Sequence, residues 1–463
     1  MTQQEKESSQ EGLSKHSRTF LFLTSLIVNL LSFTCGIIFA WTSPVIPKLK
    51  QNDTPLDHKI TIEEISWLAP LVSLGSAFGP FLGGFLVDKI GRKLSLVICA
   101  IPLTVTFICL AFSTMIELYY LSRFIMGLAI GIFMTVQPMF IGEITEITNR
   151  GMIGCLTVAF ITCGNLFSFS LGPYVTLKTF NLISSVFPLT FIILFIVFIP
   201  ESPTYLIKKN KYNEAKTALL KYRGGDKKLV DEELLQTIDA KSTENGGISE
   251  ILKTKSLKKG LIVTCGLMIV QQLTAISVVL FYLQTIFDSS GINVSSEIAT
   301  IIIGIVQIIS SVSASLTVEK AGRKVLFLIS ISGTCLTLIT LGYYFHLKEN
   351  HLEVSHLSWL PILALMIYIA TYNFGAGPIP LPVLSEIFPP HVMSVAATLT
   401  ICVCFSCSFV CSKFYPLLAV QIGTAVSFWG FAALNAVGIG FVSVCMPETK
   451  GKSRNEILAI LDK

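Results

Sequence analysis

Long apolar segments restrict this chain more than any other feature of its sequence. Each is about as long as the roughly 20 residues that an α-helix needs to cross the ~30 Å hydrocarbon core of a bilayer. Twelve such segments follow one another, and one long polar stretch divides them into two sets of six. Because backbone groups inside a bilayer must be hydrogen-bonded within the protein, we predict an all-α membrane protein with twelve transmembrane helices. The predicted spans are Thr19–Ile46, Trp67–Val87, Lys93–Phe112, Glu117–Phe140, Met152–Gly172, Asn181–Ile199, Lys259–Ile286, Glu297–Val318, Val325–Phe345, Leu360–Leu384, Ser394–Cys411 and Gln421–Met446.

The two sets of segments share a landmark that indicates an internal duplication. Gly83–Lys93 joins the second and third segments through a short turn rich in glycine, with an acid and three cations. Val318–Lys324 joins the corresponding segments of the second set in a similar way. A unit used twice predicts two pseudo-symmetric six-helix halves, residues 19–199 and 259–446, with a substrate site at the midplane between them.

Three polar stretches complete the predicted organisation, namely an N-terminal tail (1–18), a linker (200–258) and a C-terminal tail (447–463). In the linker, helical spacing predicts two short helices, Tyr212–Tyr222 and Val230–Ala240. Most of the 34 Lys and Arg residues fall on the side of the membrane that holds both tails. The positive-inside rule therefore predicts that both termini are cytosolic.

Composition excludes several classes of function. Charged residues make up 14% of the 463 positions and apolar residues 52%, which is too little charge for a soluble surface of this size. The net charge of +5 follows from membrane topology, so we expect no nucleic-acid partner. The 12 cysteines lie in or beside apolar runs and are expected to pack as small side chains. We find no enzyme constellation and no phosphate-binding glycine loop, and we expect no metal or cofactor.

Charged residues recur at the predicted cytosolic helix ends in both halves. A carboxylate and a guanidinium placed there can pair bidentately and hold neighbouring helices in one conformation. The alternative is that these charges only fix the topology. The candidate cytosolic latch residues are Asp88, Arg92, Glu143, Arg150, Glu319, Arg323 and Glu386.

Seven motifs in order along nearly the whole chain resemble those of the sugar porters of the major facilitator superfamily. A narrower set of residues, Trp41–Pro44, Ser66–Trp67 and Ser412–Phe414 followed by Phe428–Trp429, is similar to the insect facilitated trehalose transporters. The resemblance implies the major facilitator fold, a small-molecule sugar as partner and a multi-pass protein of the plasma membrane. The seven motifs are Gly83–Lys93, Ser122–Gly127, Glu143 with Arg150–Gly151, Pro200–Pro203, Gln271–Thr274, Gly377–Pro380 and Pro447–Ser453.

Polar side chains in the seventh segment are the main candidates for sugar contacts. Amides and hydroxyls both donate and accept hydrogen bonds, as a ring of sugar hydroxyls requires, and they are costly in a span when unpartnered. Gln271 and Gln272 match glutamines that contact the sugar in the family, and residues 274 and 277 are expected to share one face of a continuous helix. The alternative is hydrogen bonding between helices. The predicted substrate-binding residues are Gln271, Gln272, Thr274, Ser277, Gln307 and Asn373.

Three positions depart from the family pattern and leave the identity of the sugar open. Leu381 stands where the family usually has a tryptophan, and Ser277 and Cys404 stand where it usually has asparagines. Thr162 and Asn165 in the fifth segment are candidates for replacement contacts. Trehalose and a hexose such as glucose are both compatible with this pattern.

The mode of transport is predicted from the absence of acids. The segment Thr19–Ile46 contains no Asp, Glu, Lys, Arg or His, whereas similar proton-driven porters carry an acid in the first helix. We therefore predict facilitative uniport. Gly377, Pro378 and Pro380 are expected to break the tenth helix and to act as a gate during alternating access. A proton-coupled symporter and a non-transporting sugar sensor are the alternatives.

Two N-glycosylation sequons begin at Asn52 and Asn293, and both fall in predicted outer loops. They favour a glycoprotein of the plasma membrane. We expect the protein to be monomeric.

Overall fold

The computed structural model describes residues 3–51, 55–145, 150–224, 227, 230–231, 233–235 and 248–462. Within these ranges the side chains of residues 3–18, 150–153, 155, 315–321 and 390 are not described.

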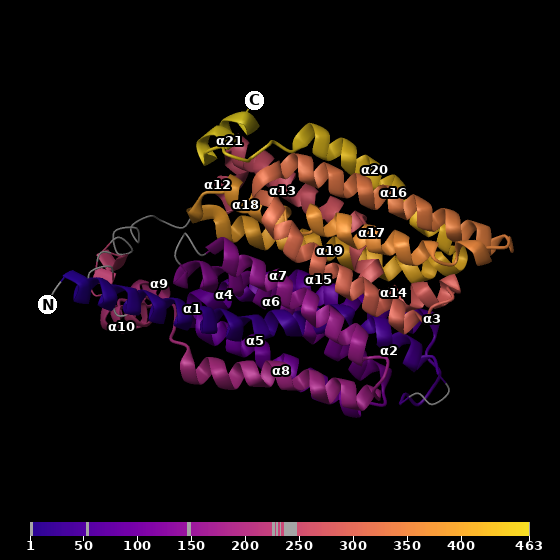
Figure 1. Cartoon of the computed structure of the whole chain (residues 1–463), viewed down its shortest axis with the longest axis horizontal. Helices are drawn as coiled ribbons and strands as arrows, with labels where there is room; N and C mark the ends of the chain where they lie inside the picture. The colour runs from indigo at the N-terminus through magenta and orange to yellow at the C-terminus, as the bar shows by residue number, and fades with distance from the viewer. Residues whose placement is uncertain are drawn as a thin grey trace.

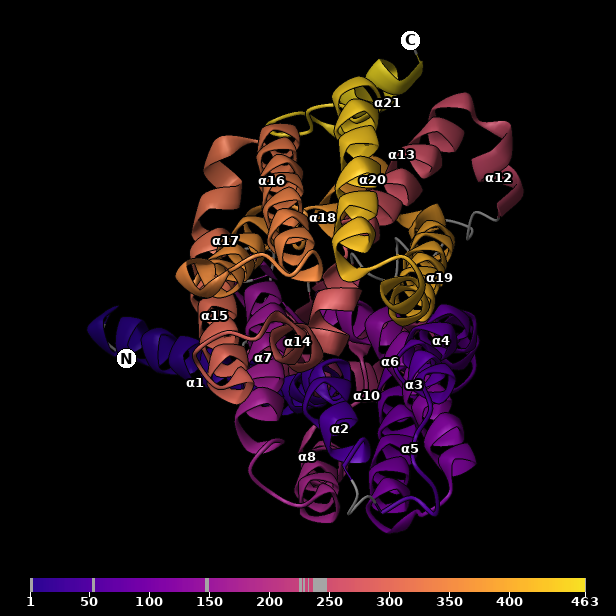
Figure 2. The same ribbon diagram turned by 90° about the vertical axis from the view of Figure 1, so that its right-hand side faces the viewer.

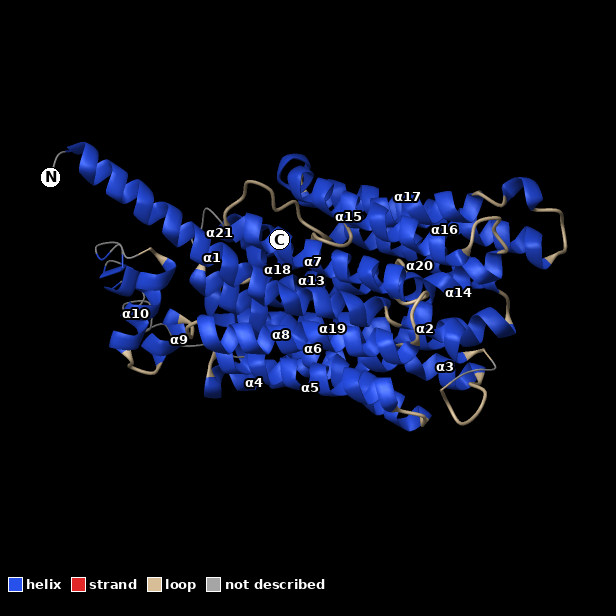
Figure 3. Ribbon diagram, turned by 60° about the horizontal axis from the view of Figure 1, so that its bottom comes forward, coloured by secondary structure: helices blue, strands red, loops and turns tan. Residues whose placement is uncertain are grey.

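The described chain is built from helices, and its ribbon carries no strand (Figure 3). The first set comprises α1 (Gln3–Ala40), α2 (Thr42–Leu49), α3 (Ile62–Leu68), α4 (Pro70–Ile90), α5 (Arg92–Phe112), α6 (Ile116–Ile144), α7 (Arg150–Leu171) and α8 (Leu177–Phe198). The second set comprises α13 (Lys255–Leu273), α14 (Ile276–Ser290), α15 (Ser296–Ala321), α16 (Arg323–Glu349), α17 (Leu360–Phe374), α18 (Pro380–Ile387), α19 (Pro390–Gln421) and α20 (Thr424–Cys445). Shorter helices are α9 (Pro203–Lys208), α10 (Tyr212–Tyr222), α12 (Ile248–Lys253) and α21 (Arg454–Asp462).

The predicted membrane-spanning architecture is confirmed. Among the described residues, 11 helical segments are long and apolar enough to cross a membrane, and a shorter apolar helix covers Leu156–Leu171. Large apolar side chains such as Leu336, Val437 and Val444 are exposed on α16 and α20. In a bilayer these side chains would face lipid instead of water.

The two sets of helices lie side by side, with their axes roughly along the long dimension of the molecule (Figure 1). The first set, from indigo to magenta, forms the lower half of the view, and most of the orange and yellow second set forms the upper half. Helix α4 packs on α19, α7 packs on α15, and α2 packs on α14 across the boundary. We call the end of the bundle that holds α9, α10 and α21 the termini end, and the end that holds α2 and α3 the far end.

Close helix packing in the first half depends on glycine. Helix α4 and helix α6 approach so closely that a Cβ atom at Gly75 would lie 2.2 Å from the carbonyl oxygen of Phe124. A Cβ atom at Gly127 would lie 2.1 Å from the carbonyl oxygen of Val72. Small residues of this kind let backbones meet in a membrane, where dispersion contacts replace the hydrophobic driving force.

The seventh predicted span is not one continuous helix, which corrects the expectation for residues 274 and 277. Helix α13 ends at Leu273 and α14 begins at Ile276, because Ala275 adopts a left-handed conformation with φ of 72°. The interruption is stabilised from outside the segment, since the Tyr368 hydroxyl donates to the carbonyl of Thr274 over 2.7 Å. The two residues therefore lie on either side of a break, so helical spacing does not relate them.

The tenth predicted span is interrupted in the region of the Gly-Pro-Ile-Pro motif. Helix α17 ends at Phe374 and α18 begins at Pro380. Gly375 packs tightly against α16, since a Cβ atom there would lie 2.4 Å from the carbonyl oxygen of Leu326. The break in the helix agrees with the prediction. The role of this segment as a gate stays a prediction.

In the linker, α10 covers Tyr212–Tyr222, as helical spacing predicts. Most of the second predicted linker helix, Val230–Ala240, lies outside the described residues.

Candidate functional site

A first cluster of buried polar side chains crosses the boundary between the two sets of helices, and we call it the serine cluster (Ser73, Gln272, Ser277, Cys404 and Ser408). The Ser277 hydroxyl donates to Oε1 of Gln272 over 2.7 Å, and its oxygen lies 2.7 Å from Oγ of Ser408. Ser408 in turn lies 2.8 Å from Oγ of Ser73, the one member of the cluster on α4. The amide of Gln272 donates to the Cys404 sulfur over 3.2 Å.

A second cluster, which we call the amide cluster, joins α7 to α15 and α17 (Asn165, Gln307, Ser310 and Asn373). Nδ2 of Asn165 donates to Oε1 of Gln307 over 3.1 Å across the boundary. Nδ2 of Asn373 donates to the Gln307 carbonyl over 3.2 Å and to Ser310 Oγ over 2.7 Å. Oδ1 of Asn165 is buried and has no hydrogen-bond partner among the described residues, so it is available to a donor group of a ligand.

Gln271 and Thr274 make hydrogen bonds at the two helix interruptions, one between α13 and α14 and the other between α17 and α18. Nε2 of Gln271 donates to the carbonyls of Ala376 and Gly377, over 2.7 Å and 3.1 Å, and so ties α13 to the segment between α17 and α18. The Thr274 hydroxyl donates to the Gln271 carbonyl over 2.6 Å. In this structure both side chains therefore make hydrogen bonds within and between helices, the alternative considered for them from sequence.

The predicted substrate-binding residues are thus divided among three places. Gln272 and Ser277 meet in the serine cluster, Gln307 and Asn373 meet in the amide cluster, and Gln271 and Thr274 lie at the helix breaks. Contact of any of them with a sugar stays a prediction. Ser73 and Ser408 carry no sequence signal of their own, because serine is common in membrane helices.

The third departure from the family pattern, Leu381, is an exposed side chain in the first turn of α18. Gly377 and Pro378 lie in the interruption itself, and the Gly377 N–H donates to the Tyr372 carbonyl over 2.9 Å.

Arg123 is a fully buried cation on α6 for which sequence analysis assigns no role. Its Nη1 donates to the Ile38 carbonyl over 3.0 Å and its Nε to the Leu68 carbonyl over 3.3 Å. The guanidinium also lies 5.0 Å from the centre of the Trp41 ring, a cation–π contact. The signal in the sequence is a single charge within an apolar segment, which marks a residue that must find polar partners inside the bundle.

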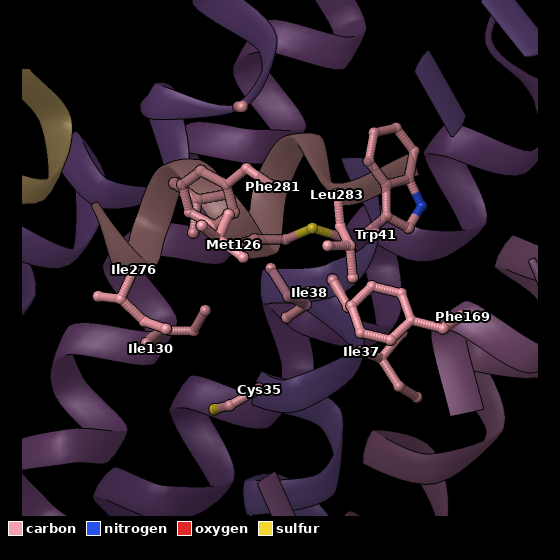
Figure 4. Close-up of a cluster of buried hydrophobic side chains, with 14 of the residues drawn as sticks. Cys35, Ile37, Ile38, Trp41, Met126, Ile130, Phe169, Ile276, Phe281 and Leu283 are labelled. Carbon is pink, nitrogen blue, oxygen red and sulfur yellow. The ribbon is translucent and has the colours of Figure 1, made fainter. Parts of the chain in front are cut away.

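Apolar side chains surround this region where the two sets of helices meet (Figure 4). Ile38 and Trp41 lie near Met126 of α6, with Phe281 and Leu283 of α14 beside them. This packing excludes water from the neighbourhood of Trp41, whose indole N–H donates to Asn181 over 2.8 Å. Exclusion of water strengthens both the cation–π contact and the hydrogen bonds of Arg123.

The candidate latch residues form ion pairs at the termini end. Arg92 and Glu143 lie 2.7 Å apart, and Arg323 and Glu386 lie 3.0 Å apart. Each of these pairs stays within one half of the molecule. Asp88 pairs instead with Lys208 at the exposed surface, over 2.9 Å. The side chains of Arg150 and Glu319 lie outside the described residues.

Two further carboxylates occupy equivalent places in the two halves. Glu201 accepts hydrogen bonds from the backbone N–H groups of Arg92 and Lys93 at the start of α5, each over 3.0 Å. Glu448 accepts from the N–H groups of Arg323 and Lys324 at the start of α16, over 2.9 Å and 3.1 Å. A carboxylate there satisfies free helix donors and interacts favourably with the helix dipole.

The two carboxylates differ in their protonation equilibria. Burial raises the pKa of Glu201 above its ordinary value, because the backbone N–H groups do not fully offset the lost hydration. Burial also opposes ionisation of Glu448, but the N–H groups of residues 450, 323, 324 and 449 outweigh it and lower its pKa. Glu448 is thus the carboxylate that these donors hold ionised.

Of the two sequons, Asn293 is exposed, and its amide donates to Ser358 Oγ over 2.9 Å. Asn52 lies outside the described residues.

Known proteins match this chain along almost its entire length. The family model described as sugar (and other) transporter matches residues 22–461. The facilitated trehalose transporter Tret1 of Bombyx mori is 34% identical over 461 residues, which cover 98% of this chain and 90% of that protein. The facilitated trehalose transporter Tret1 of Apis mellifera ligustica is 32% identical over 443 residues, which cover 95% of this chain and 88% of that protein.

Solved structures match the fold. The partially occluded, inward-open conformation of the xylose transporter XylE from E. coli gives a TM-score of 0.79 at 21% identity, covering 94% of this chain and 100% of that one. The proton:xylose symporter XylE bound to 6-bromo-6-deoxy-D-glucose gives a TM-score of 0.78 at 21% identity, and the match covers 96% of this chain and 100% of that one. The matched family and relatives are transporters and not enzymes. This chain therefore belongs to the sugar transporter family and is a sugar porter with the fold of the major facilitator superfamily.

Proposed function

We propose that this sugar porter is a facilitative carrier, a uniporter that moves trehalose or a hexose such as glucose by alternating access. The names of the Tret1 relatives, facilitated trehalose transporters, make trehalose the first cargo to test. The halves 19–199 and 259–446 would rock against each other around a site between them.

The observation that carries the uniport proposal is the environment of Arg123. Its partners are the carbonyls of Ile38 and Leu68 and the Trp41 ring, and no described carboxylate lies within ion-pair distance of it. Carbonyls and indole rings neither take up nor release protons near neutral pH. The charge of Arg123 is therefore balanced by groups that do not titrate, whereas proton coupling requires a membrane-embedded group that does.

The two polar clusters support the assignment of a sugar as cargo. Both contain amides or hydroxyls from each half, and both lie where the halves meet. Sugar hydroxyls can replace the hydrogen bonds between these side chains one for one, so that buried polar groups stay paired with and without cargo. Gln271, Gln272, Thr274, Ser277, Gln307 and Asn373 are the proposed sugar contacts, with Asn165 added on the opposite wall.

Transport would alternate between closure at the two ends of the bundle. The ion pairs Arg92–Glu143 and Arg323–Glu386 are the proposed latches at the termini end, where each holds together the helix ends of its own half. The interruption at residues 375–379 is the proposed hinge, because its backbone is tied to α13 through Gln271.

The proposal places the chain in the plasma membrane as a monomer with both termini in the cytosol. The sequons at Asn52 and Asn293 would then face outward, where glycosylation occurs.

The test is uptake of labelled trehalose and glucose into proteoliposomes that hold the purified protein, with and without a pH gradient. A uniporter gives saturable uptake that ignores the gradient. Gln272→Ala is expected to lose this uptake, while Asn435→Ala keeps it, because Asn435 is a buried amide that bonds Thr334 within the second half. Uptake that requires the gradient would contradict uniport in favour of symport, and no uptake by folded protein would favour the sensor alternative.

A further inference from the structure

Lys413 is a buried lysine in α19, near the far end of the bundle. Its ammonium group donates to Oγ of Ser66 over 2.6 Å and lies 3.8 Å from the centre of the Trp67 ring. Ser66 and Trp67 belong to α3, in the other half of the molecule. A desolvated cation is thus held across the boundary by a hydroxyl and an aromatic face.

Lys413 differs from the latch arginines Arg92 and Arg323 in the groups that neutralise its charge. The ion pairs of the described residues do not include Lys413, and Glu63 is the carboxylate that adds a favourable field. The latch arginines at the termini end, by contrast, pair with carboxylates inside their own half. Lys413 therefore depends on the opposite half for its polar partner.

Both sides of this contact are held in position by their own half. Helix α3 begins with a capping box, in which the Glu64 N–H donates to Thr61 Oγ over 3.2 Å and the Thr61 N–H donates to the Glu64 carboxylate over 2.7 Å. On α19, the carbonyl of Ser412 accepts a hydrogen bond from the Tyr282 hydroxyl over 3.1 Å. Because both surfaces are already held in position, they lose little conformational entropy when they meet, and more of the contact's free energy goes into holding the far end closed.

Other contacts close the far end beside Lys413. The N–H of Gln284 on α14 donates to Ser43 Oγ on α2 over 3.0 Å. The rings of Trp67 and Phe409 lie 6.2 Å apart. Figure 2 looks onto this end and shows α3 beside α19 and α2 beside α14, in agreement with the packing of these pairs.

We propose that Lys413 is the gate residue of the far end, which holds that end closed through Ser66 and Trp67 and releases them when it opens. Opening separates the halves and exchanges both contacts for water. Because opening would break the contact, the contact shifts the equilibrium between the two states of the carrier toward far-end closure. The inference rests on the proposed alternating access, but its test needs no sugar and no assumption about coupling.

The experiment measures how fast a hydrophilic maleimide modifies a reporter cysteine, Ser43→Cys, in the purified full-length protein in detergent. Ser43 is fully buried at the far-end boundary, so its modification reports opening of that end. Modification is read on the peptide that contains residue 43, which separates the reporter from the native cysteines. With Lys413→Met the rate is expected to rise about fivefold or more, since a desolvated cation–π contact and a charged hydrogen bond are lost.

The chain offers a matched control in Lys178. Its ammonium group lies 4.6 Å from the centre of the Phe112 ring, and both residues belong to the first half. Lys178→Met removes a cation–π contact of the same kind without touching the boundary, so the reporter should react at the parent rate. Lys413→Arg keeps a cation that stacks on indole and should restore most of the protection.

A double-mutant cycle distinguishes loss of the specific contact between Lys413 and Trp67 from a general destabilisation of the fold. Trp67→Leu should also speed modification. The rate of Lys413→Met with Trp67→Leu should stay below the product of the two single effects, because both changes remove the shared cation–π contact. Parent-rate modification in folded Lys413→Met would overturn the proposal. So would multiplicative effects of the two changes, or an equal rise in Lys178→Met.

Discussion

Gln272 shows how a single amide is made tolerable inside a membrane span. Its donor meets the Cys404 sulfur and its acceptor meets the Ser277 hydroxyl, so both ends of the side chain are occupied. Each of those partners belongs to a second contact, and the Ser277 oxygen is shared with Ser408. One residue thus anchors a chain of hydrogen bonds that ends in the opposite half at Ser73.

Replacement of Gln272 by leucine is expected to weaken both transport and stability. The change removes one hydrogen bond from Ser277 and one from Cys404, each of which keeps a second partner, at a cost of about 0.5–1.5 kcal/mol per hydrogen bond. Transport should fall at least tenfold if sugar hydroxyls use the same amide, which uptake kinetics would measure beside a thermal unfolding curve in detergent. A stability loss with unchanged transport would restrict Gln272 to a structural role.

At the scale of helices, packing distance is set by residues without side chains. Helices α4 and α6 meet through Gly75 and Gly127, where a Cβ atom would contact backbone and not a movable side chain. Backbone cannot move aside without displacing the whole helix, and α4 also carries Ser73 of the serine cluster. The position of that serine therefore depends on glycines on a neighbouring helix.

Gly127→Ala is expected to destabilise the protein by roughly 1–3 kcal/mol, the usual cost of overpacking. Gly142→Ala is the control in the same helix, since a Cβ atom there would meet no atom of the described residues within 4 Å. Because alanine favours a helix more than glycine does, Gly142→Ala should leave the free energy of unfolding unchanged or raise it. Thermal unfolding of both variants in one detergent compares them, and equal behaviour would contradict the close approach of α4 and α6.

The carboxylate of Glu448, which accepts hydrogen bonds from the first N–H groups of α16, makes the stability of the protein depend on pH. Glu448 has a lowered pKa in the folded protein, so its ionised form is favoured by folding. Its contribution is full above the pKa of an unfolded glutamate, near 4.3, and is lost as the pH falls through the lower folded pKa. Glu448→Gln should therefore lower the melting temperature at pH 7, and the difference from the parent should shrink as the pH falls below about 4. A constant difference across this range would exclude ionisation as the cause.

At the scale of the whole molecule, the two halves touch through polar groups that a moving carrier must separate. Oγ of Ser73 and Oγ of Ser408 lie 2.8 Å apart on α4 and α19, which belong to different halves. Rocking of the halves would change this distance. The pair is therefore a direct probe of whether the boundary moves during transport.

Cysteines at both positions should form a disulfide on mild oxidation, since the side chains already point at each other. The cross-linked Ser73→Cys, Ser408→Cys protein is expected to lose at least nine tenths of its uptake and to recover it on reduction. Thr264→Cys with Thr400→Cys is the matched control, because those hydroxyl oxygens lie 3.4 Å apart within the second half. Parent-rate uptake by the fully cross-linked first pair would show that the boundary does not move there.

Local pattern in the sequence predicted the membrane spans, the helix α10 and the break in the tenth segment. Apolar runs, helix terminal signals and proline act over a few residues, so their effects can be read without knowledge of the fold. The motifs also predicted the family, which the match over residues 22–461 confirms. Of the candidate site, the sequence alone predicted the amides and hydroxyls of the seventh segment by their polarity in an apolar setting.

Only the tertiary structure decided which of those groups meet. No local signal marks the break at Ala275, because alanine favours a helix and the interruption is held by Tyr368 from another helix. The hydrogen-bond acceptors of Arg123 are backbone carbonyls, which every residue carries, and the hydroxyl that Lys413 contacts lies 347 residues away, at Ser66 on α3. Contacts of this kind depend on how the helices pack, and packing is a property of the assembled bundle that no single segment encodes.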